Sequence, residues 1–429
     1  MLSMHRMAIA LGTIALVAAC SGGSSPSPSV QATTASTAAS ATTAASAATA
    51  TTGAAATAGN TSAGPEGDAF YVPPSPLPPG QPGDIIWSRP FAGPGGAQGY
   101  EVLYLSTTVA DQPVAVSGVV IVPGPNALAA PPEGRTVLSW AHGTTGLGDD
   151  CAPSKQYPTG QAGELLLAQV AVGRGFVYAA TDYEGLGPPG DHPYVVGLSE
   201  GRNVLDITRA AERLAGSGAS PTSKVVVWGH SQGGGAALFA AELAPSYAAD
   251  IQVVGVVAGA PATEFATVAA ANDGGPNAGF LLMGLVGFHA AYPTLSYDAV
   301  LNPAGVEAVA AIDKQCSAAI NENYSGTHLA DYTTTDPASA PGWSEAYAAN
   351  EAGQVKTPVP IFMYQGDADD IVPVAVSETA LQKYCALGVT VSRKVYPGAD
   401  HISVITAALT DILGFVNDRL AGRPAPSSC

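Results

Sequence analysis

The first candidate for chemistry in this 429-residue chain is Ser231, within the segment GHSQG at residues 229–233. An apolar run precedes the segment and a small-residue run that favours helix follows it, so a G-x-S-x-G motif stands between an expected strand and an expected helix. A sharp strand-to-helix turn strains the serine backbone and lifts Oγ clear of the sheet. This context predicts that Ser231 is a nucleophile. The alternative is a glycine-rich turn in which the serine has no special role.

A serine hydroxyl is a weak nucleophile and needs a general base, which in turn needs an orienting group. With this motif the expected chain order is Ser, then Asp or Glu, then His. Three of the seven histidines follow Ser231, namely His289, His328 and His401. His401 stands on a short loop between a strand-like run and a helix-like run, whereas the other two lie in a segment interpreted as an insertion. His401 is therefore the predicted base.

The acid candidates are three carboxylates in the turn after the expected strand at residues 360–364. Asp369 fits the G-x-x-D-x-x-V arrangement usual in this type of fold, and Asp367 and Asp370 are its nearest rivals. Aspartate is also a common turn former because its side chain bonds nearby backbone groups. We expect Asp369 to orient His401 and the other two carboxylates to shape the loop.

Negative charge on a carbonyl oxygen under attack needs backbone N–H donors. The first predicted donor is Gln232, at the start of the expected helix. The second should come from the segment HGTTG at residues 142–146, where either Gly143 or Thr144 could supply it; Thr144 is favoured. His142 is interpreted as a structural histidine beneath this loop. The segment at 182–187 is interpreted as a lining of the acyl pocket or a brace for the loop.

The order of the expected elements predicts an α/β fold. A strand hairpin opens the pattern, and later strands alternate with helices, which indicates a mostly parallel sheet with helices on both faces, as in an α/β-hydrolase fold. The hairpin is expected at 100–107 and 114–122, and the helices at 161–173, 199–215 and 231–244.

Residues 262–355 have no strand pattern and are too long for a loop. They contain helical patches such as 306–320, and they are predicted to form a largely helical cap over the site. A peripheral excursion is the alternative. The apolar run at 280–288 has two interpretations, the lining of an acyl tunnel or packing within the cap.

Several segments taken together resemble the secretory lipase family, whose best-known members are yeast enzymes of the lipase A type and which has bacterial relatives. The resemblance covers about residues 70–429 and implies that the chain is a lipase or esterase with Ser231, Asp369 and His401 as its triad. Yeast members often carry Tyr before the nucleophile, where this chain has His230, so the resemblance leaves the acyl preference open. The segments are HGTTG (142–146), CAPS (151–154), DYEG (182–185), GHSQG (229–233), DDIVP (369–373) and YP (396–397) with His401.

The same triad would serve a polyester hydrolase, another carboxylesterase or a peptidase. A catalytically inactive surface protein that binds through this fold is the alternative of a different class. The formal net charge of −18 argues against a nucleic-acid partner, because phosphate binding needs a basic face. The histidines are scattered, and the glycines at 233–235 lack a following Lys, so neither a metal nor another cofactor is expected.

The N-terminus predicts export. Residues 1–19 carry an Arg and a His before an apolar stretch that is too short to span a bilayer, as in a signal peptide. Cys20 follows small residues as in a bacterial lipoprotein signal, where cleavage leaves the cysteine for lipidation. The alternative is an ordinary signal peptide and a secreted protein. Residues 20–64 are mostly Ser, Ala, Thr, Gly and Pro, which predicts a disordered tether from a membrane anchor to a catalytic domain at 65–429.

Four cysteines remain when Cys20 is set aside, an even number that is typical of disulfide bonding in an exported protein. They allow three pairings. The family resemblance implies that Cys151 pairs with Cys316 and that Cys385 pairs with Cys429.

Overall fold

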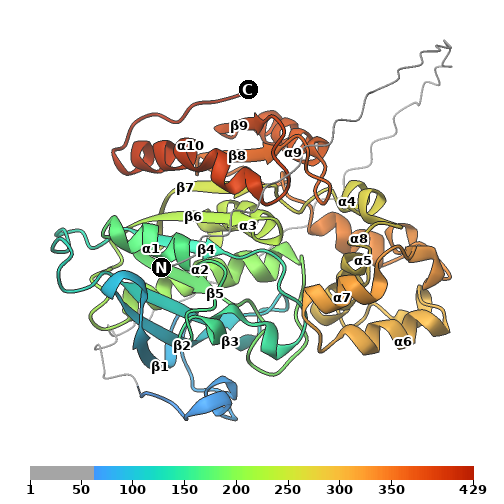
Figure 1. Cartoon of the computed structure of the whole chain (residues 1–429), viewed down its shortest axis with the longest axis horizontal. Coiled ribbons are helices and arrows are strands. Elements are labelled where there is room, and N and C mark those ends of the chain that lie inside the picture. The colour runs from blue at the N-terminus through green and yellow to red at the C-terminus, as the bar shows by residue number, and fades with distance from the viewer. Residues whose placement is uncertain (1–61) are drawn as a thin grey trace, which may run out of the picture. The chain divides into compact units, whose positions relative to one another are not determined.

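The computed structural model describes residues 62–429, so the predicted signal peptide, Cys20 and nearly all of the predicted tether lie outside the described residues. Nine strands form one sheet in the order β1-β2-β3-β5-β4-β6-β7-β8-β9 (Figure 1). The strands are β1 (Ile85–Ala92), β2 (Gln98–Thr107), β3 (Pro113–Val122), β4 (Val137–Ala141), β5 (Val177–Thr181), β6 (Lys224–His230), β7 (Gln252–Gly259), β8 (Ile361–Gly366) and β9 (Val391–Tyr396).

The sheet changes from antiparallel to parallel along its width. β1, β2 and β3 pair in antiparallel fashion, and β3 also pairs antiparallel with β5. The pairs from β5 and β4 through β6, β7 and β8 to β9 are all parallel. The opening hairpin and the mostly parallel α/β sheet that the sequence predicted are thus confirmed.

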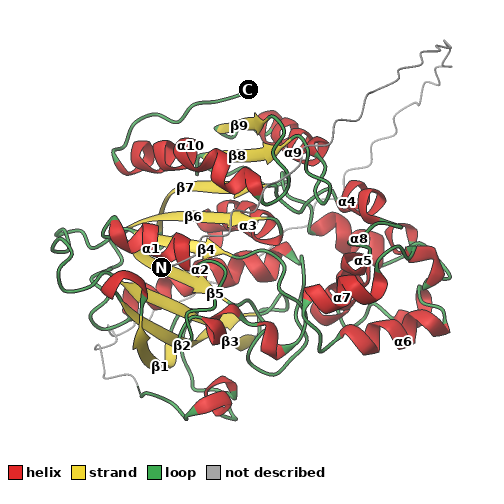
Figure 2. Ribbon diagram, in the orientation of Figure 1, coloured by secondary structure: helices red, strands yellow, loops and turns green. Residues whose placement is uncertain are grey.

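Helices pack on both faces of the sheet (Figure 2). Val225 and Val227 of β6 point into a core shared with α2 (Gly197–Arg213), α3 (Gln232–Tyr247) and α9 (Val374–Ala386). The alternate residues Val226 and Trp228 point into a second core, shared with α1 (Leu165–Gly173) and α10 (Ser403–Leu420). Since successive side chains of a strand alternate between faces, the two cores lie on opposite sides of the sheet.

The insertion, residues 262–355 between β7 and β8, carries five α-helices. They are α4 (Phe265–Asn272), α5 (Gly279–Ala291), α6 (Pro303–Ile312), α7 (Ser317–Tyr324) and α8 (Trp343–Ala349). The insertion has an apolar core of its own, in which Met283, Ile312 and Trp343 are buried. The helical patch expected at 306–320 is two helices, because the chain between α6 and α7 forms a bridge from Cys316 to Gly146.

The described residues also contain short 3-10 helices, at Gly67–Tyr71, Pro94–Gly96, Asp149–Cys151, Pro153–Gln156, Tyr297–Ala299, Leu329–Asp331 and Pro337–Ser339. No helix within residues 62–429 is both long and apolar enough to cross a membrane.

Both disulfides implied by the family resemblance are present in the structure. Cys151 pairs with Cys316, which joins the 3-10 helix after β4 to the start of α7 in the insertion. Cys385 pairs with Cys429, which fastens the C-terminus to α9.

Two glycines allow the close turn from β6 into α3. A Cβ added at Gly229 would lie 1.9 Å from the carbonyl oxygen of Gly233. A Cβ at Gly233 would lie 1.9 Å from the carbonyl oxygen of Ala141 in β4. Both obstacles are backbone atoms within packed elements, so a side chain at either position forces α3 away from the strand that it packs on.

We predict that Gly229→Ala lowers the free energy of unfolding by about 3 kcal/mol or more, because the extra methyl group overlaps backbone that cannot retreat. The matched control is Gly414→Ala in α10, where an added Cβ meets nothing within 4 Å. That control should raise stability by about 0.5–1 kcal/mol, as expected for glycine replaced in a helix interior. Urea denaturation of both variants provides the measurement, and equal midpoints would contradict the close packing of the turn.

Candidate active site

Ser231 occupies the turn between the end of β6 and the start of α3. Its φ of 61° and ψ of −123° lie in a region that residues with side chains rarely adopt. The N–H of Ser231 donates to the carbonyl of Gly259 (2.9 Å), and its own carbonyl accepts from the N–H of Ala262 (3.0 Å). The end of β7 and the chain after it therefore hold the strained serine from both sides.

His401 and Asp369 form a buried pair. The Nδ1 atom of His401 lies 2.8 Å from Oδ2 of Asp369, and the Asp369 side chain has no solvent exposure. Oδ1 of Asp369 accepts from the N–H groups of Ile371 (3.0 Å) and Val372 (2.8 Å). These donors hold the carboxylate in place, and its oxygen opposite Nδ1 favours the tautomer with the proton on Nδ1, which leaves Nε2 as an acceptor.

One more side chain supports this pair and was missed by the sequence analysis. The Nε2 atom of Gln365, at the end of β8, donates to Oδ2 of Asp369 (2.9 Å) and to the carbonyl of Val372 (3.0 Å). Gln365 therefore fixes both the carboxylate and the turn that carries it. Its place one residue before Gly366, at the end of a strand, was the available signal.

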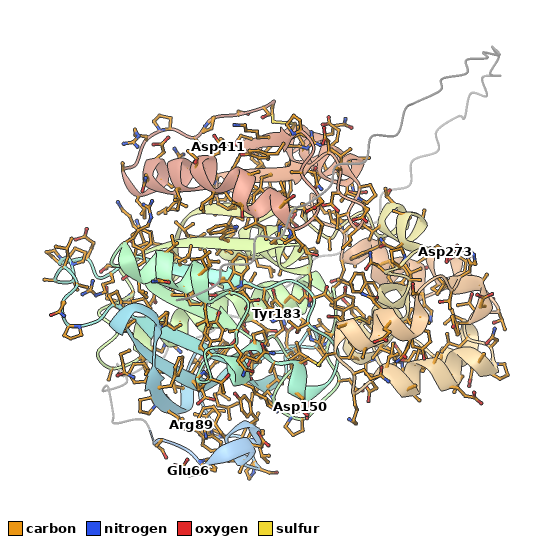
Figure 3. The ribbon with its side chains drawn as sticks, in the orientation of Figure 1. Glu66, Arg89, Asp150, Tyr183, Asp273 and Asp411 are labelled. Atoms are coloured by element: carbon orange, nitrogen blue, oxygen red, sulfur yellow. A yellow bond between two sulfur atoms is a disulfide. The ribbon has the colours of Figure 1, made fainter. Side chains whose placement is uncertain are left out.

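The rival acids and histidines have other partners. Asp367 is exposed and accepts from the N–H of Gly398 (2.5 Å), while Asp370 is also exposed. In the insertion, His289 contacts the carbonyl of Leu295 (2.7 Å), and His328 pairs with Asp273, which Figure 3 labels. The structure thus brings together His401 and Asp369, as the sequence analysis expected.

His230 is a neighbour of both the serine and the histidine. The ring of His230 lies 4.8 Å from the ring of His401, centroid to centroid, and His230 directly precedes Ser231. Burial lowers the pKa of His230 to about 3, so this ring is neutral beside His401. The hydrogen bonds of residues 62–429 include none between Ser231 and His401, and such bonds are often long before substrate binds.

Of the two residues expected to supply oxyanion donors, Gln232 directly follows Ser231 and Thr144 lines the same cavity. Gln232 is the first residue of α3, so its N–H has no helical carbonyl partner four residues back. On the other side, a Cβ built at Gly143 would lie 3.6 Å from Cβ of Ser231, and Thr144 lines the same cavity as Ser231. The hydroxyl of Thr144 bonds that of Tyr194 (2.9 Å).

The loop that carries Thr144 is fastened to the insertion. The N–H of Ser317 donates to the carbonyl of Thr145 (2.8 Å), and the N–H of Leu147 donates to the carbonyl of Gln315 (3.0 Å). The disulfide of Cys151 with Cys316 adds a covalent link a few residues further on. Movement of α7 would therefore displace this loop.

His142 and Asp182 have structural contacts. His142 is buried, its ring nitrogens face the carbonyls of Gly143 (2.7 Å) and Asp182 (3.2 Å), and its ring packs on Tyr183 (4.4 Å; Figure 3). The Asp182 carboxylate accepts from the hydroxyl of Ser117 (2.6 Å) and from the N–H of Ser154 (2.8 Å). Of the two interpretations of this segment, the structure supports a brace.

An apolar cavity lies between Ser231 and the insertion. Within the run 280–288, one set of side chains lines the cavity and another set, which includes Met283 and Val286, packs in the core of the insertion. The run therefore both borders the cavity and packs within the insertion, and Leu285 and Phe288 do both. The cavity-lining members are Phe280, Leu281, Gly284, Leu285 and Phe288.

A sheet of this topology, with a strained serine after a central strand and a buried Asp–His pair after later strands, defines an α/β-hydrolase. The model of the secretory lipase family matches residues 156–428, and the chain belongs to that family. It is an ester-hydrolysing enzyme of the lipase and esterase type.

Known proteins from fungi and bacteria resemble the chain along most of its length. A secreted triacylglycerol lipase of Malassezia globosa is 27% identical over 386 residues, which cover 84% of this chain and 81% of that protein. A probable inactive lipase of Mycobacterium tuberculosis is 26% identical over 378 residues, with 84% and 83% covered. The structure of Candida antarctica lipase A in its closed state aligns with a TM-score of 0.74 at 25% identity, over 84% of this chain and 88% of that one.

Proposed function

We propose that this protein hydrolyses carboxylic esters of lipids, foremost acylglycerols, through an acyl-enzyme formed on Ser231. The observation that carries the proposal is the buried pair of His401 and Asp369 beside a serine held in a strained turn. The apolar cavity at the serine supports a fatty acyl chain as the group that binds there.

The proposed reaction has two halves. Ser231 Oγ attacks the ester carbonyl carbon while Nε2 of His401 takes the hydroxyl proton, and the N–H groups of Gln232 and Thr144 hold the oxyanion. His401 then returns the proton to the leaving alcohol. Water attacks the acyl-enzyme with His401 as base, which releases the fatty acid and restores Ser231. Asp369 keeps His401 in the required tautomer throughout.

We also propose that residues 65–429 are the catalytic domain and that the insertion, residues 262–355, is its cap. Residues of α4 and α5 share the cavity lining with Ser231, which supports this division. The links from α7 to the loop of Thr144 support a cap that adjusts locally, with a small mobile flap, and does not swing as a whole.

Ser231→Ala and His401→Ala should each reduce kcat by about 10⁴- to 10⁶-fold without loss of the fold, because members of such a triad act as a unit. Asp369→Asn should be less damaging than either. Hydrolysis of p-nitrophenyl butyrate, with circular dichroism as the control for folding, measures this. A crippling effect of Asp367→Asn or Asp370→Asn would show that the acid was wrongly assigned.

A fluorophosphonate probe separates the enzyme from a surface protein that merely binds lipid. The probe should label wild-type protein at Ser231 and leave Ser231→Ala unlabelled. Absence of labelling in the folded wild type would favour the inactive alternative. A preference for peptide or polyester substrates over acylglycerols in the same assays would refute the substrate class.

Gly284→Trp should depress hydrolysis of long-chain p-nitrophenyl esters at least about tenfold more than hydrolysis of the acetate or butyrate. An added Cβ at Gly284 meets nothing within 4 Å, so the indole can enter the cavity. Gly287 is unsuitable for this test, because a Cβ there would lie 2.4 Å from the Tyr194 carbonyl oxygen. Gly414→Trp, on the exposed side of α10, is the control, and equal losses across chain lengths would count against an acyl cavity.

We further propose that the protein is exported and anchored to the cell surface through a lipidated Cys20. Secretion of the Malassezia relative supports export, and the small residues before Cys20 support processing as a lipoprotein. Mass spectrometry of the mature N-terminus should find acylated Cys20, and Cys20→Ser should release the enzyme or block its processing. A mature N-terminus elsewhere, on protein free in the medium, would refute the anchor.

A further inference from the structure

A buried carboxyl group lies directly behind the first proposed oxyanion donor. Glu200, near the start of α2, is 1% exposed, and its Oε1 accepts from Nε2 of Gln232 (2.7 Å). The same amide nitrogen lies 3.0 Å from Nε2 of His192, which is also buried. The residue after the nucleophile is thus held by its side chain as well as by its place in α3.

The hydrogen bonds of this cluster define the direction of each donor. Nδ1 of His192 lies 2.7 Å from the carbonyl oxygen of Glu184, which can only accept, so Nδ1 carries the proton and Nε2 is the acceptor. Burial lowers the pKa of His192 to about 3, which keeps the ring neutral. Both hydrogens of the Gln232 amide are therefore used, one toward His192 and one toward Glu200.

Glu200 also contacts the segment that supports the second donor. Its Oε1 accepts from the N–H of Val195 (2.9 Å), a residue with a φ of 53° that is strained for a β-branched side chain. The adjacent Tyr194 bonds the hydroxyl of Thr144 (2.9 Å), and both residues line the cavity with Ser231. Oε1 of Glu200 therefore accepts hydrogen bonds from Gln232, the first proposed donor, and from Val195, which is next to the tyrosine that bonds Thr144.

The charge state of Glu200 matters because no cation pairs with its carboxyl group within residues 62–429. Burial raises the pKa of Glu200 to about 8, so the group is mostly neutral at neutral pH and ionises above it. The titratable groups around it come from the loop between β5 and α2, from the loop after β4 and from α2 itself. Tyr183 and Tyr194 interact electrostatically with Glu200, and Glu184 and His192 lie on the same loop. His142 interacts with His192, and Arg202 interacts with Glu184 and pairs with Asp111.

We infer that Glu200 is a positioning residue that aligns both oxyanion donors, through the side chain of Gln232 and through the N–H of Val195. The inference rests on the proposed function. An ionised Glu200 would place a buried negative charge behind the groups that stabilise an oxyanion, so ionisation opposes the transition state. The wild-type kcat should accordingly fall as the pH rises through about 8.

The test compares Glu200→Gln and Glu200→Leu with wild type, through kcat and KM for p-nitrophenyl butyrate between pH 6 and 10. Glutamine resembles the neutral carboxyl group but cannot ionise, so Glu200→Gln should keep kcat within a few-fold of wild type at pH 7 and lose the alkaline decline. Glu200→Leu should lower kcat by about tenfold to a hundredfold and change KM by less than about threefold. The reason is that misaligned donors weaken stabilisation of the oxyanion in the transition state and leave substrate binding nearly unchanged.

Glu212→Gln is the matched control. Glu212 lies at the far end of the same helix, and burial raises its pKa to about 8 as well, but it has no contact with Gln232. This variant should keep the wild-type alkaline decline. If Glu200→Leu does not fold, the dependence of kcat on pH in Glu200→Gln decides by itself whether Glu200 has the positioning role.

The inference is overturned if Glu200→Gln shares the wild-type alkaline profile, or if a folded Glu200→Leu has wild-type kcat. Fluorophosphonate labelling distinguishes this failure from failure of the proposed function. Normal labelling of Ser231 together with unchanged Glu200 variants would reject the positioning role alone. Loss of labelling in the wild type would reject the proposed function itself.

Discussion

The strained backbone of Ser231 is the constraint on which the rest of the structure depends. A residue with a side chain at a φ of 61° costs on the order of 1–3 kcal/mol and persists where its surroundings leave no alternative. Here the carbonyl of Gly259 and the N–H of Ala262 hold the residue, and the glycines at 229 and 233 let β4, β6 and α3 approach closely. The buried parallel strands thus maintain a turn that a surface loop could not.

Parallel topology explains how groups distant in sequence meet at this turn. The carboxyl ends of parallel strands lie along one edge of a sheet, which is where α/β proteins place their sites. β6 ends at Ser231, β8 leads to Asp369, and β9 leads to His401, with β7 between the first two. Gln365 at the end of β8 then fixes the carboxylate that orients the histidine.

The insertion borders Ser231 and also supplies residues that line the cavity there. It supplies most of the apolar cavity, and α7 is joined to the loop of Thr144 by main-chain hydrogen bonds and a disulfide. A large displacement of α7 would disturb the loop of Thr144, so the apolar cavity and this loop form one packed unit. Selectivity for the acyl chain is then expected to depend on the residues that line the cavity, such as Gly284.

The sequence by itself determined the features that local patterns encode. The alternation of strand-like and helix-like segments predicted the mostly parallel sheet and its helices, and motif spacing singled out Ser231, Asp369 and His401 with few rivals. Family resemblance supplied the disulfide pairs. The break between α6 and α7, the roles of Gln365 and Glu200, and the contrast between Gly284 and Gly287 were decided by the tertiary structure. Each of these depends on which way a side chain faces and on partners from other elements, such as Gln232 for Glu200, and local sequence does not specify such pairings.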